Sequence, residues 1–455
     1  MDFVSTRDNQ YKKITASQAI VNGLAVDGGL YVPCAFPALH GFIGASYERT
    51  ALEILSLYLT DFEVDELKES IHLAYGDCLP VAVNGRYLEL YHGRTSAFKD
   101  VALQLFPYLL TASLHKQHIN QTAVILTATS GDTGSAVLAG VKNVPGMRAI
   151  VFYPVDGVSK TQKLQMTTQE ANNINVYGIK GNFDDAQSAV KSIFADERFR
   201  AKYADRYLFT SANSINIGRL LPQIAYYFYA YSQSVCTGTI REGDVINFVV
   251  PTGNFGNILA GYYARKMGLP IHILICATNE NNVLFELIRT GVYDKKRQFK
   301  TTFSPSMDIL VSSNLERLIY DIGGYETVIR VYQSLLDIGE FSLYQSLPVF
   351  DSEFVSDSET LQTIAEVFHT NNVMIDPHTA VAQCAYNKYK QRTGDATYPV
   401  IVATASPYKF PETVRKALGD VLFDPPLSLK SLEEKPVVHS EVIEDIRQTI
   451  EKILQ

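Results

Sequence analysis

A short apolar strand, a turn and an amphipathic helix follow one another repeatedly along the chain, and this order constrains the fold more than any other feature. Strands are predicted at 122–126, 148–153, 175–179, 244–250, 271–277 and 398–403. Helices are predicted to begin near residues 135, 159, 184, 257 and 411. Alternating strands and helices favour parallel sheets with helices packed on both faces. The sequence therefore predicts an α/β protein.

Other segments show the apolar spacing of helices. Residues 44–75 and roughly 308–370 carry apolar side chains three and four positions apart, which predicts mainly helical structure there. Near the C-terminus, Ser440 can cap a helix with one apolar stripe, formed by Val442, Ile443, Ile446, Ile450, Ile453 and Leu454. We expect this helix to dock on the core. Another helix is rich in aromatic rings, which favours core packing over stacking on nucleobases: Tyr226, Tyr227, Phe228, Tyr229 and Tyr231.

Composition excludes several classes of protein. Of the 455 residues 46% are apolar, and 40 basic against 48 acidic residues give a net charge of −8. At ~100–200 residues per domain this length predicts two to four domains, and the apolar content excludes a disordered chain. A net negative charge without runs of Lys or Arg argues against binding to nucleic acid. No apolar stretch approaches the ~18 residues of a membrane span, so no membrane association is expected.

Cysteine usage indicates the compartment. The five cysteines, at positions 34, 78, 236, 276 and 384, lie far apart, and no two have C-x-x-C spacing. This pattern excludes zinc fingers and ribbons and favours reduced thiols in a reducing compartment. The first residues lack the charged-then-apolar pattern of a signal peptide. We therefore expect a cytoplasmic protein without a metal site.

Three turns could bind anions. Residues 129–134 and 253–257 are glycine-containing turns between a predicted strand and a predicted helix. Glycine permits close backbone approach, and a helix start offers free N–H groups and a positive dipole end. In the third turn, 213–219, Asn and Ser can cap a helix, and Arg219 could reach an anion held there. From the residues alone, ordinary turns and a surface arginine remain alternatives.

Lys99 is the candidate nucleophile. It follows Phe98 and precedes the apolar residues Val101, Ala102 and Leu103. Burial lowers the pKa of an amine, and the neutral amine is a nucleophile that forms Schiff bases. A lysine whose apolar stem lies along the surface while its ammonium group stays in water remains the alternative.

Taken together and in this order, these segments resemble the threonine synthase family, whose members are pyridoxal-phosphate enzymes of the tryptophan-synthase-β fold (fold type II). The similar segments extend over nearly the whole chain: 5–7, 27–33, 92–100, 126–134, 181–185, 211–219, 251–257, 306–308, 376–382 and 404–410. The resemblance implies two parallel-sheet α/β domains and a mainly helical N-terminal domain. The implied divisions are an N-terminal domain at 1–90, a domain with the Schiff-base lysine and the substrate loops at 91–235, and a larger domain with the cofactor-phosphate loop at 236–455.

The resemblance also implies a role for individual residues. Lys99 would carry pyridoxal 5′-phosphate, and its phosphate would lie on the loop of Gly253, Asn254, Phe255, Gly256 and Asn257. Asp132 matches a position facing the cofactor's ring oxygen, where many relatives have Asn, and Thr404 matches the hydroxyl that meets the pyridine nitrogen. The substrate carboxylate would be held by Thr129, Ser130 and Thr133. The substrate phosphate would be held by Asn213, Ser214 and Arg219.

The implied reaction converts O-phospho-L-homoserine and water into L-threonine and phosphate, by γ-elimination and β-hydration. A related phospho-lyase releasing 2-oxobutanoate and ammonia is the alternative enzyme, and an inactive relative serving as a binding protein is the alternative from another class. A small-molecule substrate and a monomer or homodimer are expected. The chain departs from the family at three positions: Arg94 stands where relatives often have Pro, Ser406 where many have His, and Asp376 where Glu is common. Ser406 therefore lacks a titratable group.

Overall fold

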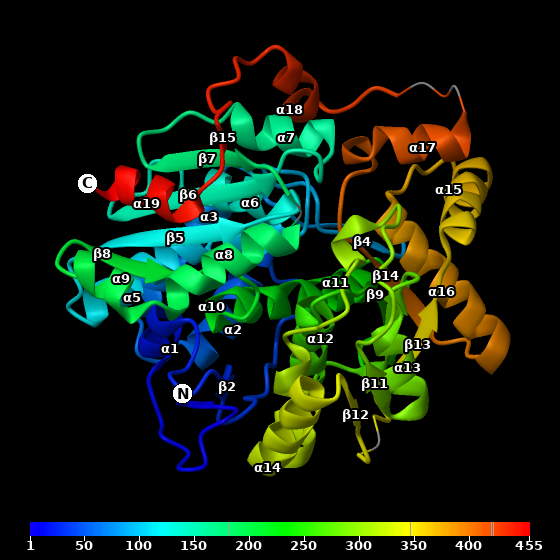
Figure 1. Ribbon diagram of the computed structural model, residues 1–455. Helices are drawn as coiled ribbons and strands as arrows, with labels where there is room; N and C mark the ends of the chain where they lie inside the picture. Colours follow the sequence, from blue (N-terminus) through cyan, green and yellow to red (C-terminus); the bar gives the residue numbers. More distant parts are fainter. Residues whose placement is uncertain (182, 346, 420, 422) are drawn as a thin grey trace.

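The computed structural model describes residues 1–181, 183–345, 347–419, 421 and 423–455. Asn182 and the side chains of Phe183 and Asp184, which belong to the similar segment 181–185, lie outside this description. Two sheets divide the molecule, one at the left and one at the right of Figure 1. Their strands alternate with helices along the chain, so the α/β class is confirmed.

The first sheet has five strands in the order β15-β7-β6-β5-β8, all parallel. They are β5 (Thr122–Ala128), β6 (Met147–Pro154), β7 (Ile174–Ile179), β8 (Tyr207–Thr210) and β15 (Val442–Ile443). Neighbouring residues of β5 point to opposite faces, so Ile125 packs with α6 (Asp132–Val141) while Val124 packs with α8 (Phe183–Ala195). Burial on both faces explains why such a strand reads as a continuous apolar run.

The second sheet has six strands in the order β13-β10-β9-β14-β4-β3, parallel except for the β3–β4 pair. They are β3 (Ala82–Asn84), β4 (Tyr87–Glu89), β9 (Ile246–Pro251), β10 (Ile271–Thr278), β13 (Phe350–Phe354) and β14 (Tyr398–Ala403). On one face lie α15 (Asp357–Asn371) and α16 (Pro377–Thr393). On the other face lie α11 (Ile224–Cys236) and α12 (Gly256–Lys266). The aromatic helix α11 is thus core, as predicted.

The N-terminal part is mainly helical. It has α1 (Ala16–Asn22), α2 (Tyr47–Tyr58) and α3 (Val64–Tyr75), with one short antiparallel pair, β1 (Phe3–Ser5) and β2 (Tyr31–Pro33). Apolar residues of α2 and α3, such as Ile54, Leu55 and Ile71, are buried in the core shared with α5 (Phe106–Lys116) and α11. The predicted helical structure over 44–75 is therefore confirmed.

The remaining elements connect these layers. They are α4 (Lys99–Leu103), α7 (Lys160–Thr167), α9 (Glu197–Tyr203), α10 (Ile217–Leu220), α13 (Val283–Thr290), β11 (Val292–Asp294), α14 (Leu315–Asp337), β12 (Glu340–Ser342), α17 (Pro411–Leu418), α18 (Leu427–Lys430) and α19 (Ile446–Leu454). Four short 3-10 turns are η1 (Leu221–Gln223), η2 (Pro305–Met307), η3 (Pro407–Lys409) and η4 (Ser431–Glu433). Helix α14 is kinked where Gly324 has φ +70°.

Two predictions about element type need correction. The stretch 308–370 is not helical throughout, because β12 and the sheet-edge strand β13 interrupt it. The C-terminal helix begins at Ile446, and its cap is Asp445, whose Oδ1 accepts a hydrogen bond from Gln448 N (3.0 Å), rather than Ser440. Val442 and Ile443 form β15, because pairing with β7 satisfies their backbone groups. The docking of this helix is confirmed by the burial of Ile450 and Leu454.

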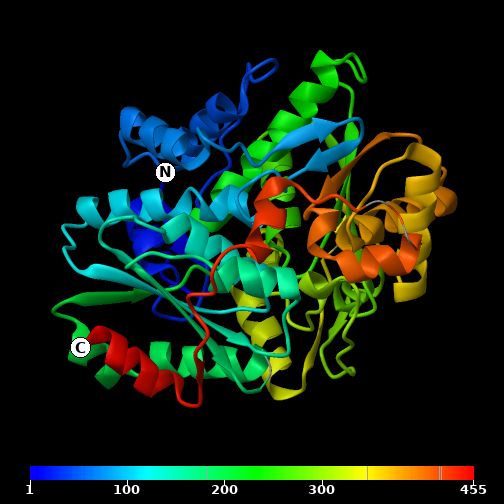
Figure 2. The same cartoon turned by 90° about the horizontal axis from the view of Figure 1, so that it is seen from above.

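The sheets cross the predicted division points. Strands β3 and β4, before residue 90, join the second sheet, whereas β15 and α19, near the C-terminus, return to the first. Figure 2 shows this red C-terminal segment crossing back over the molecule to the cyan and green elements. The division at residues 90 and 235 stays a prediction. Within the described residues no helix is long and apolar enough to cross a membrane.

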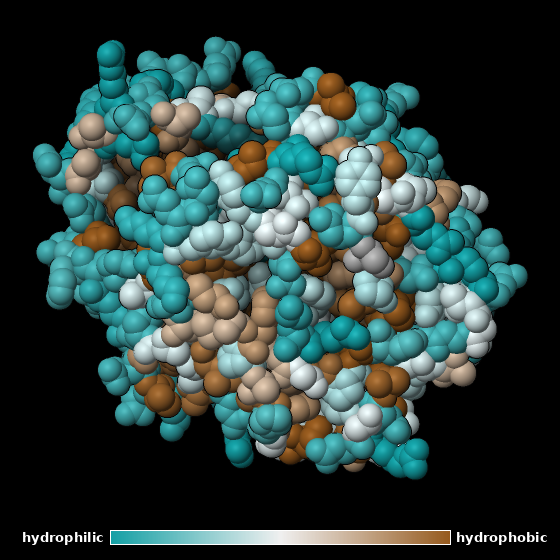
Figure 3. Space-filling view, turned by 90° about the horizontal axis from the view of Figure 1, so that it is seen from below, coloured by the Kyte–Doolittle hydropathy of each residue, from teal (hydrophilic) through white to brown (hydrophobic). Residues whose placement is uncertain are grey.

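The surface around the end of α14 carries several exposed apolar side chains, which are Ile329, Leu336, Ile338 and Tyr344. In Figure 3, which shows the molecule from below, brown hydrophobic groups lie between teal hydrophilic ones. Isolated apolar residues of this kind are common on protein surfaces.

Candidate active site

The end of β14 positions Lys99. The segment after β14 runs antiparallel to the residues before Lys99, with a bridge between Ala97 and Ala405. Phe98 N donates to the Thr404 carbonyl (2.7 Å), and Ser406 N donates to the Ser96 carbonyl (3.0 Å). Two residues predicted to meet the cofactor, Lys99 and Thr404, are therefore held side by side at the carboxyl end of a parallel strand, where α/β proteins commonly bind ligands.

The electrostatic surroundings make Lys99 a weak base. Its half-buried side chain makes no hydrogen bond to any residue that the structure describes. Burial lowers the pKa of Lys99 to about 8; the Asp132 carboxylate opposes this change, and the Arg219 and Lys409 cations add to it. At neutral pH this leaves roughly 300-fold more neutral amine than an ordinary lysine has. The amine is therefore suited to the predicted covalent role.

Asp132 begins helix α6, directly after Gly131, whose φ of +131° is a conformation suited to glycine. Its Oδ1 lies 2.7 Å from Lys409 Nζ and accepts a hydrogen bond from Gln162 Nε2 (3.0 Å). Burial alone raises the pKa of Asp132, but the Lys409 and Lys99 cations outweigh burial and hold the pKa well below its usual range. Asp132 is therefore an ionised hydrogen-bond acceptor in this site.

The turn at 129–134 is shaped by the Thr129 hydroxyl. Its oxygen accepts hydrogen bonds from Gly131 N (3.0 Å) and Gly134 N (2.9 Å). Two N–H groups of the turn are thus used internally, while Thr129 retains its own O–H as a donor. Ser130 is exposed and Thr133 half-buried. The role of Thr129, Ser130 and Thr133 toward a substrate carboxylate stays a prediction.

The predicted phosphate loop has the features of an anion cradle. Phe255 lies in the left-handed region, with φ +64°, immediately before α12. A Cβ on Gly253 would lie 2.8 Å from the Ser306 carbonyl oxygen, so this position has no room for a side chain. The Asn257 carbonyl oxygen Oδ1 accepts from the Tyr226 and Tyr227 hydroxyls, both at 2.7 Å. The buried Asn257 Nδ2 has no partner among the described residues and remains available to an anion.

Asn314 joins the two predicted phosphate sites. Its Nδ2 donates to Ser214 Oγ (3.2 Å) and to the Asn254 carbonyl (3.2 Å). Arg317, fully buried in the first turn of α14, holds Asn314, the residue just before that helix, by donating to its Oδ1 (2.5 Å). Neither residue was predicted from the sequence. They bring Ser214 next to the loop of Asn254, as the predicted roles require.

Arg219 is a buried cation without a carboxylate partner among the described residues. It lies on the short helix α10, is 3% exposed, and donates from Nη1 to the Ala212 carbonyl (2.5 Å). Its Nε is buried without any described partner. Burial lowers the pKa of Arg219 to about 10. An unpaired buried guanidinium is costly unless an anion meets it, so Arg219 fits the predicted grip on phosphate.

Residues of the similar segments 306–308 and 376–382, for which the resemblance implied no individual role, support the Asp132 side of the site. Ser306 Oγ lies 3.4 Å from Asp132 Oδ2, and Ser306 N donates to His378 Nε2 (3.1 Å). The other ring nitrogen of His378 lies 2.8 Å from Asp376 Oδ1. Asp376 also caps helix α16 by accepting from His378 N (2.9 Å). The departure from Glu to Asp at this position therefore coincides with a short side chain that serves as a helix cap.

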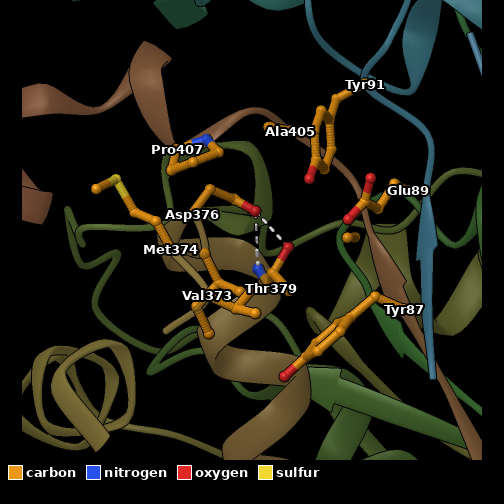
Figure 4. Close-up of a pocket in the computed structure, with 11 residues that line it drawn as sticks. Tyr87, Glu89, Tyr91, Val373, Met374, Asp376, Thr379, Ala405 and Pro407 are labelled. Atoms are coloured by element: carbon orange, nitrogen blue, oxygen red, sulfur yellow. Dashed lines mark hydrogen bonds between the residues drawn. The ribbon is translucent and has the colours of Figure 1, made fainter. Parts of the chain in front are cut away.

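A pocket lies on the other side of the segment after β14 (Figure 4). The space that it encloses is small, about 10 Å³. Figure 4 shows Glu89 and Tyr91 facing Asp376 and Thr379 across it. The lining residues are Tyr87, Glu89, Tyr91, Val373, Met374, Ile375, Asp376, Thr379, Ala403, Ala405 and Pro407. None of the residues predicted to bind cofactor or substrate lines this pocket.

The other two departures differ in their surroundings. Arg94 is exposed. Ser406 is 4% exposed, and its hydroxyl donates to no described residue. Nothing in the structure explains the change at Arg94.

The site residues fit pyridoxal 5′-phosphate. That cofactor has an aldehyde, a phosphate, a phenolic oxygen and a ring nitrogen, and each needs a different partner. The described residues offer a weakly basic amine at Lys99, an unpartnered buried amide N–H₂ at Asn257 and a hydroxyl without a described partner at Thr404. The fold and the site thus define a pyridoxal-phosphate-dependent enzyme, and a family model of that description matches residues 88–405.

The remaining parts of the chain match more specific models. The threonine synthase N terminus matches residues 2–75, and the threonine synthase C-terminal model matches residues 379–453. A threonine synthase of Eremothecium gossypii is 36% identical over 99% of this chain and 97% of its own length. The chain belongs to the threonine synthase family.

Other comparisons agree in fold. The crystal structure of a pyridoxal-phosphate-bound threonine synthase from Brucella melitensis has a TM-score of 0.90 and 33% identity, covering 100% of this chain and 98% of that one. Human threonine synthase-like 1 is 39% identical over 91% of this chain, which corresponds to 60% of the human protein. The predicted fold type II architecture is confirmed.

Proposed function

We propose that this chain is a threonine synthase that converts O-phospho-L-homoserine and water into L-threonine and phosphate. The observation that carries the proposal is the Arg219 guanidinium, buried without a carboxylate partner among the described residues, beside the weakly basic Lys99. The first group suits a phosphate ester and the second an amino acid. The matches to threonine synthases over nearly the full length support the same substrate.

Each group has a defined task in this reaction. When bound, pyridoxal phosphate supplies an electron-withdrawing ring that stabilises negative charge at the substrate Cα. The Lys99 amine takes the Cα proton and later moves protons at Cβ and Cγ. Arg219, with Asn213 and Ser214, holds the phosphate at the γ position and stabilises its charge as the Cγ–O bond breaks. Water then adds at Cβ, which gives threonine.

The turn of Thr129, Ser130 and Thr133 would orient the substrate carboxylate, and Thr404 would donate its hydroxyl hydrogen bond to the ring nitrogen. A hydroxyl leaves that nitrogen neutral, which makes the ring a milder electron sink than a carboxylate partner would. Burial of the surrounding residues excludes bulk water, which strengthens each of these electrostatic contacts.

The pathway and the location follow from the reaction and from the cysteines. We infer a role in threonine biosynthesis from the reaction itself. We infer a cytoplasmic location because the five cysteines are all free thiols, as in reducing compartments. A monomer or homodimer stays a prediction.

Product analysis tests the proposal. The purified, cofactor-loaded protein is incubated with O-phospho-L-homoserine, and threonine, 2-oxobutanoate and phosphate are quantified. We expect threonine and phosphate in equal amounts. Formation of 2-oxobutanoate and ammonia in place of threonine would favour a phospho-lyase. Release of neither product would refute both activities.

Borohydride reduction tests the cofactor site separately. Reduction should fix the cofactor on a single peptide that contains Lys99. Label on another lysine, such as Lys409, would contradict the assignment.

A further inference from the structure

Lys409 is a fully buried lysine that neither the reaction nor the sequence analysis has used. Its side chain is 0% exposed, and its Nζ lies 2.7 Å from Asp132 Oδ1. It also donates to the Thr95 carbonyl (2.9 Å). Burying a lysine is costly unless its charge is both paired and hydrogen-bonded, and Lys409 meets both conditions.

The contacts of Lys409 connect separate walls of the site. Thr95 belongs to the segment before Lys99, and it is held in turn by Asp100, whose carboxylate accepts from Thr95 N (2.7 Å) and Thr95 Oγ1 (2.7 Å). Gln165 Nε2 donates to the same Thr95 carbonyl (2.9 Å). Asp132 begins the substrate-side helix α6. The Lys409 ammonium group therefore fixes the segment before Lys99 against the turn at 129–134.

The positive charge of Lys409 neutralises the negative charge of Asp132. Asp132 is buried, and its pKa is held below its usual range, so the site carries a buried negative charge. The pair formed by Asp132 and Lys409 would offer the cofactor a carboxylate acceptor without adding net charge. Lys409 lies in the part that matches the threonine synthase C-terminal model, outside the match to pyridoxal-phosphate enzymes in general.

We propose that Lys409 is a positioning residue of the active site, which holds the Asp132 carboxylate toward the cofactor and cancels its charge beside Lys99. This inference rests on the proposed function for its activity readout only. The charged groups that face Lys99 are Asp132, Arg219 and Lys409, and the pKa of Lys99 is sensitive to each of them. Asp100 faces Lys409 from the other side.

Substituting the two members of the pair should shift the pKa of Lys99 in opposite directions. Lys409→Met removes a repelling cation and leaves Asp132 unpaired, so the pKa of Lys99 should rise by about one unit. Asp132→Asn removes the attracting carboxylate, so the pKa should fall by about as much. The double variant removes both charges, and the pKa should return close to that of the parent protein. A merely structural role would not produce this order.

The titration is measured on the protein freed of cofactor. Competitive acetylation at a series of pH values, read for the Lys99 peptide by mass spectrometry, gives the pKa of Lys99 in each variant. Equal values in all four proteins, or a lower value in Lys409→Met, would overturn the proposal. Because removing one partner of a buried pair destabilises a protein, Lys409→Met could remain unfolded. The pKa of Lys99 in Asp132→Asn is then compared with that in the double variant. Failure of the double variant to fold would also overturn the proposal.

Kinetics give a second readout on the cofactor-loaded enzyme. Each single variant should lower kcat at least tenfold while KM changes less than about threefold, because the substrate contacts at Arg219 remain. The double variant should recover most of the loss. If the parent protein forms no threonine, the proposed function fails, whereas the order of Lys99 pKa values still tests the pair.

Lys388 offers a matched control. Its Nζ also contacts one carboxylate, Glu359 (2.7 Å), and one backbone carbonyl, that of Phe354 (2.8 Å), but its side chain is 31% exposed on α16. Lys388→Met should leave both the Lys99 titration and kcat unchanged. A comparable loss in this control would mean that the effects of Lys409→Met are nonspecific, and the proposal would fall.

Discussion

Two buried arginines should respond to the same substitution with opposite changes in stability. Arg219 and Arg317 are both almost completely buried, and burial lowers the pKa of each to about 10. The pKa change of each corresponds to a penalty on the charged form of about 3 kcal/mol. Arg219 donates to one acceptor, the Ala212 carbonyl. Arg317 donates to three, on Tyr31, Asn314 and Ile215.

The number of hydrogen-bond acceptors that each arginine leaves behind determines whether the substitution stabilises or destabilises the protein. Arg219→Met relieves the burial penalty but leaves one acceptor unsatisfied, at about 2 kcal/mol, so it should stabilise the protein by about 1 kcal/mol. Arg317→Met relieves a similar penalty but leaves three acceptors unsatisfied, at about 2 kcal/mol each, so it should destabilise by about 3 kcal/mol. Unfolding a chain of 455 residues changes the free energy by about 1 kcal/mol per degree near Tm. The expected shifts are therefore about +1 °C for Arg219→Met and −3 °C for Arg317→Met.

Thermal unfolding of the cofactor-loaded protein, with and without inorganic phosphate, measures both effects. Phosphate at 100 times its Kd should stabilise the parent protein by about 2.7 kcal/mol, and Arg219→Met should abolish that response. The same variant should lose nearly all threonine formation. The reasoning is refuted if Arg219→Met lowers Tm, or if its response to phosphate equals that of the parent protein.

Three further outcomes are expected. Lys99→Ala should be colourless after addition of pyridoxal phosphate and form no threonine, as an absorbance scan and product analysis would reveal; full activity would contradict the assignment. Gly253→Ala should weaken cofactor retention about tenfold, because its Cβ would lie 2.8 Å from the Ser306 carbonyl, whereas Gly256→Ala meets only an ordinary contact at 3.4 Å and should retain cofactor in dialysis. Cofactor loading should quicken as pH rises and level off above about pH 8, where Lys99 is neutral; a rate independent of pH between 6 and 9 would count against it. Burial of the charged Lys99 destabilises the folded protein fully below about pH 8. This destabilisation is lost as the pH rises further, because the unfolded chain's lysine binds the proton more strongly.

Long regular elements could be predicted from the sequence because their signals are local. Strand β14 matches its predicted residues 398–403, since an apolar, β-branched run ends there at a polar segment. The tail shows the limit of such signals. Val442 and Ile443 fit the stripe of a helix equally well as a strand, and only the presence of β7 beside them decides. Strand β13 was missed for the same reason, because its partner β10 lies far away in sequence.

In the candidate site, too, residues in local motifs could be predicted, whereas residues that depend on distant contacts could not. Lys99 and the loop 253–257 belong to contiguous segments, so the resemblance could predict a role for them. Lys409 is separated by 314 positions from the carbonyl it binds, and nothing in its neighbours indicates complete burial. Asn314 and Arg317 act between loops that only the folded chain brings together. Residues that position others are therefore harder to find than residues that react.

Local charge explains how an acidic chain can hold anionic ligands. Lys99, Arg219, Lys409 and Asp132 bring three positive charges and one negative charge into one site, although the whole chain carries −8. Within that set, Lys409 and Asp132 are paired at 2.7 Å and contribute no net charge. Lys99 and Arg219 remain as the two charges without a carboxylate hydrogen-bonded to them in the described structure. Lys99 suits the amino-acid end of the substrate as an amine, and Arg219 suits the phosphate as a cation, so the internal pair leaves Arg219 as the cation that meets the anionic ligand.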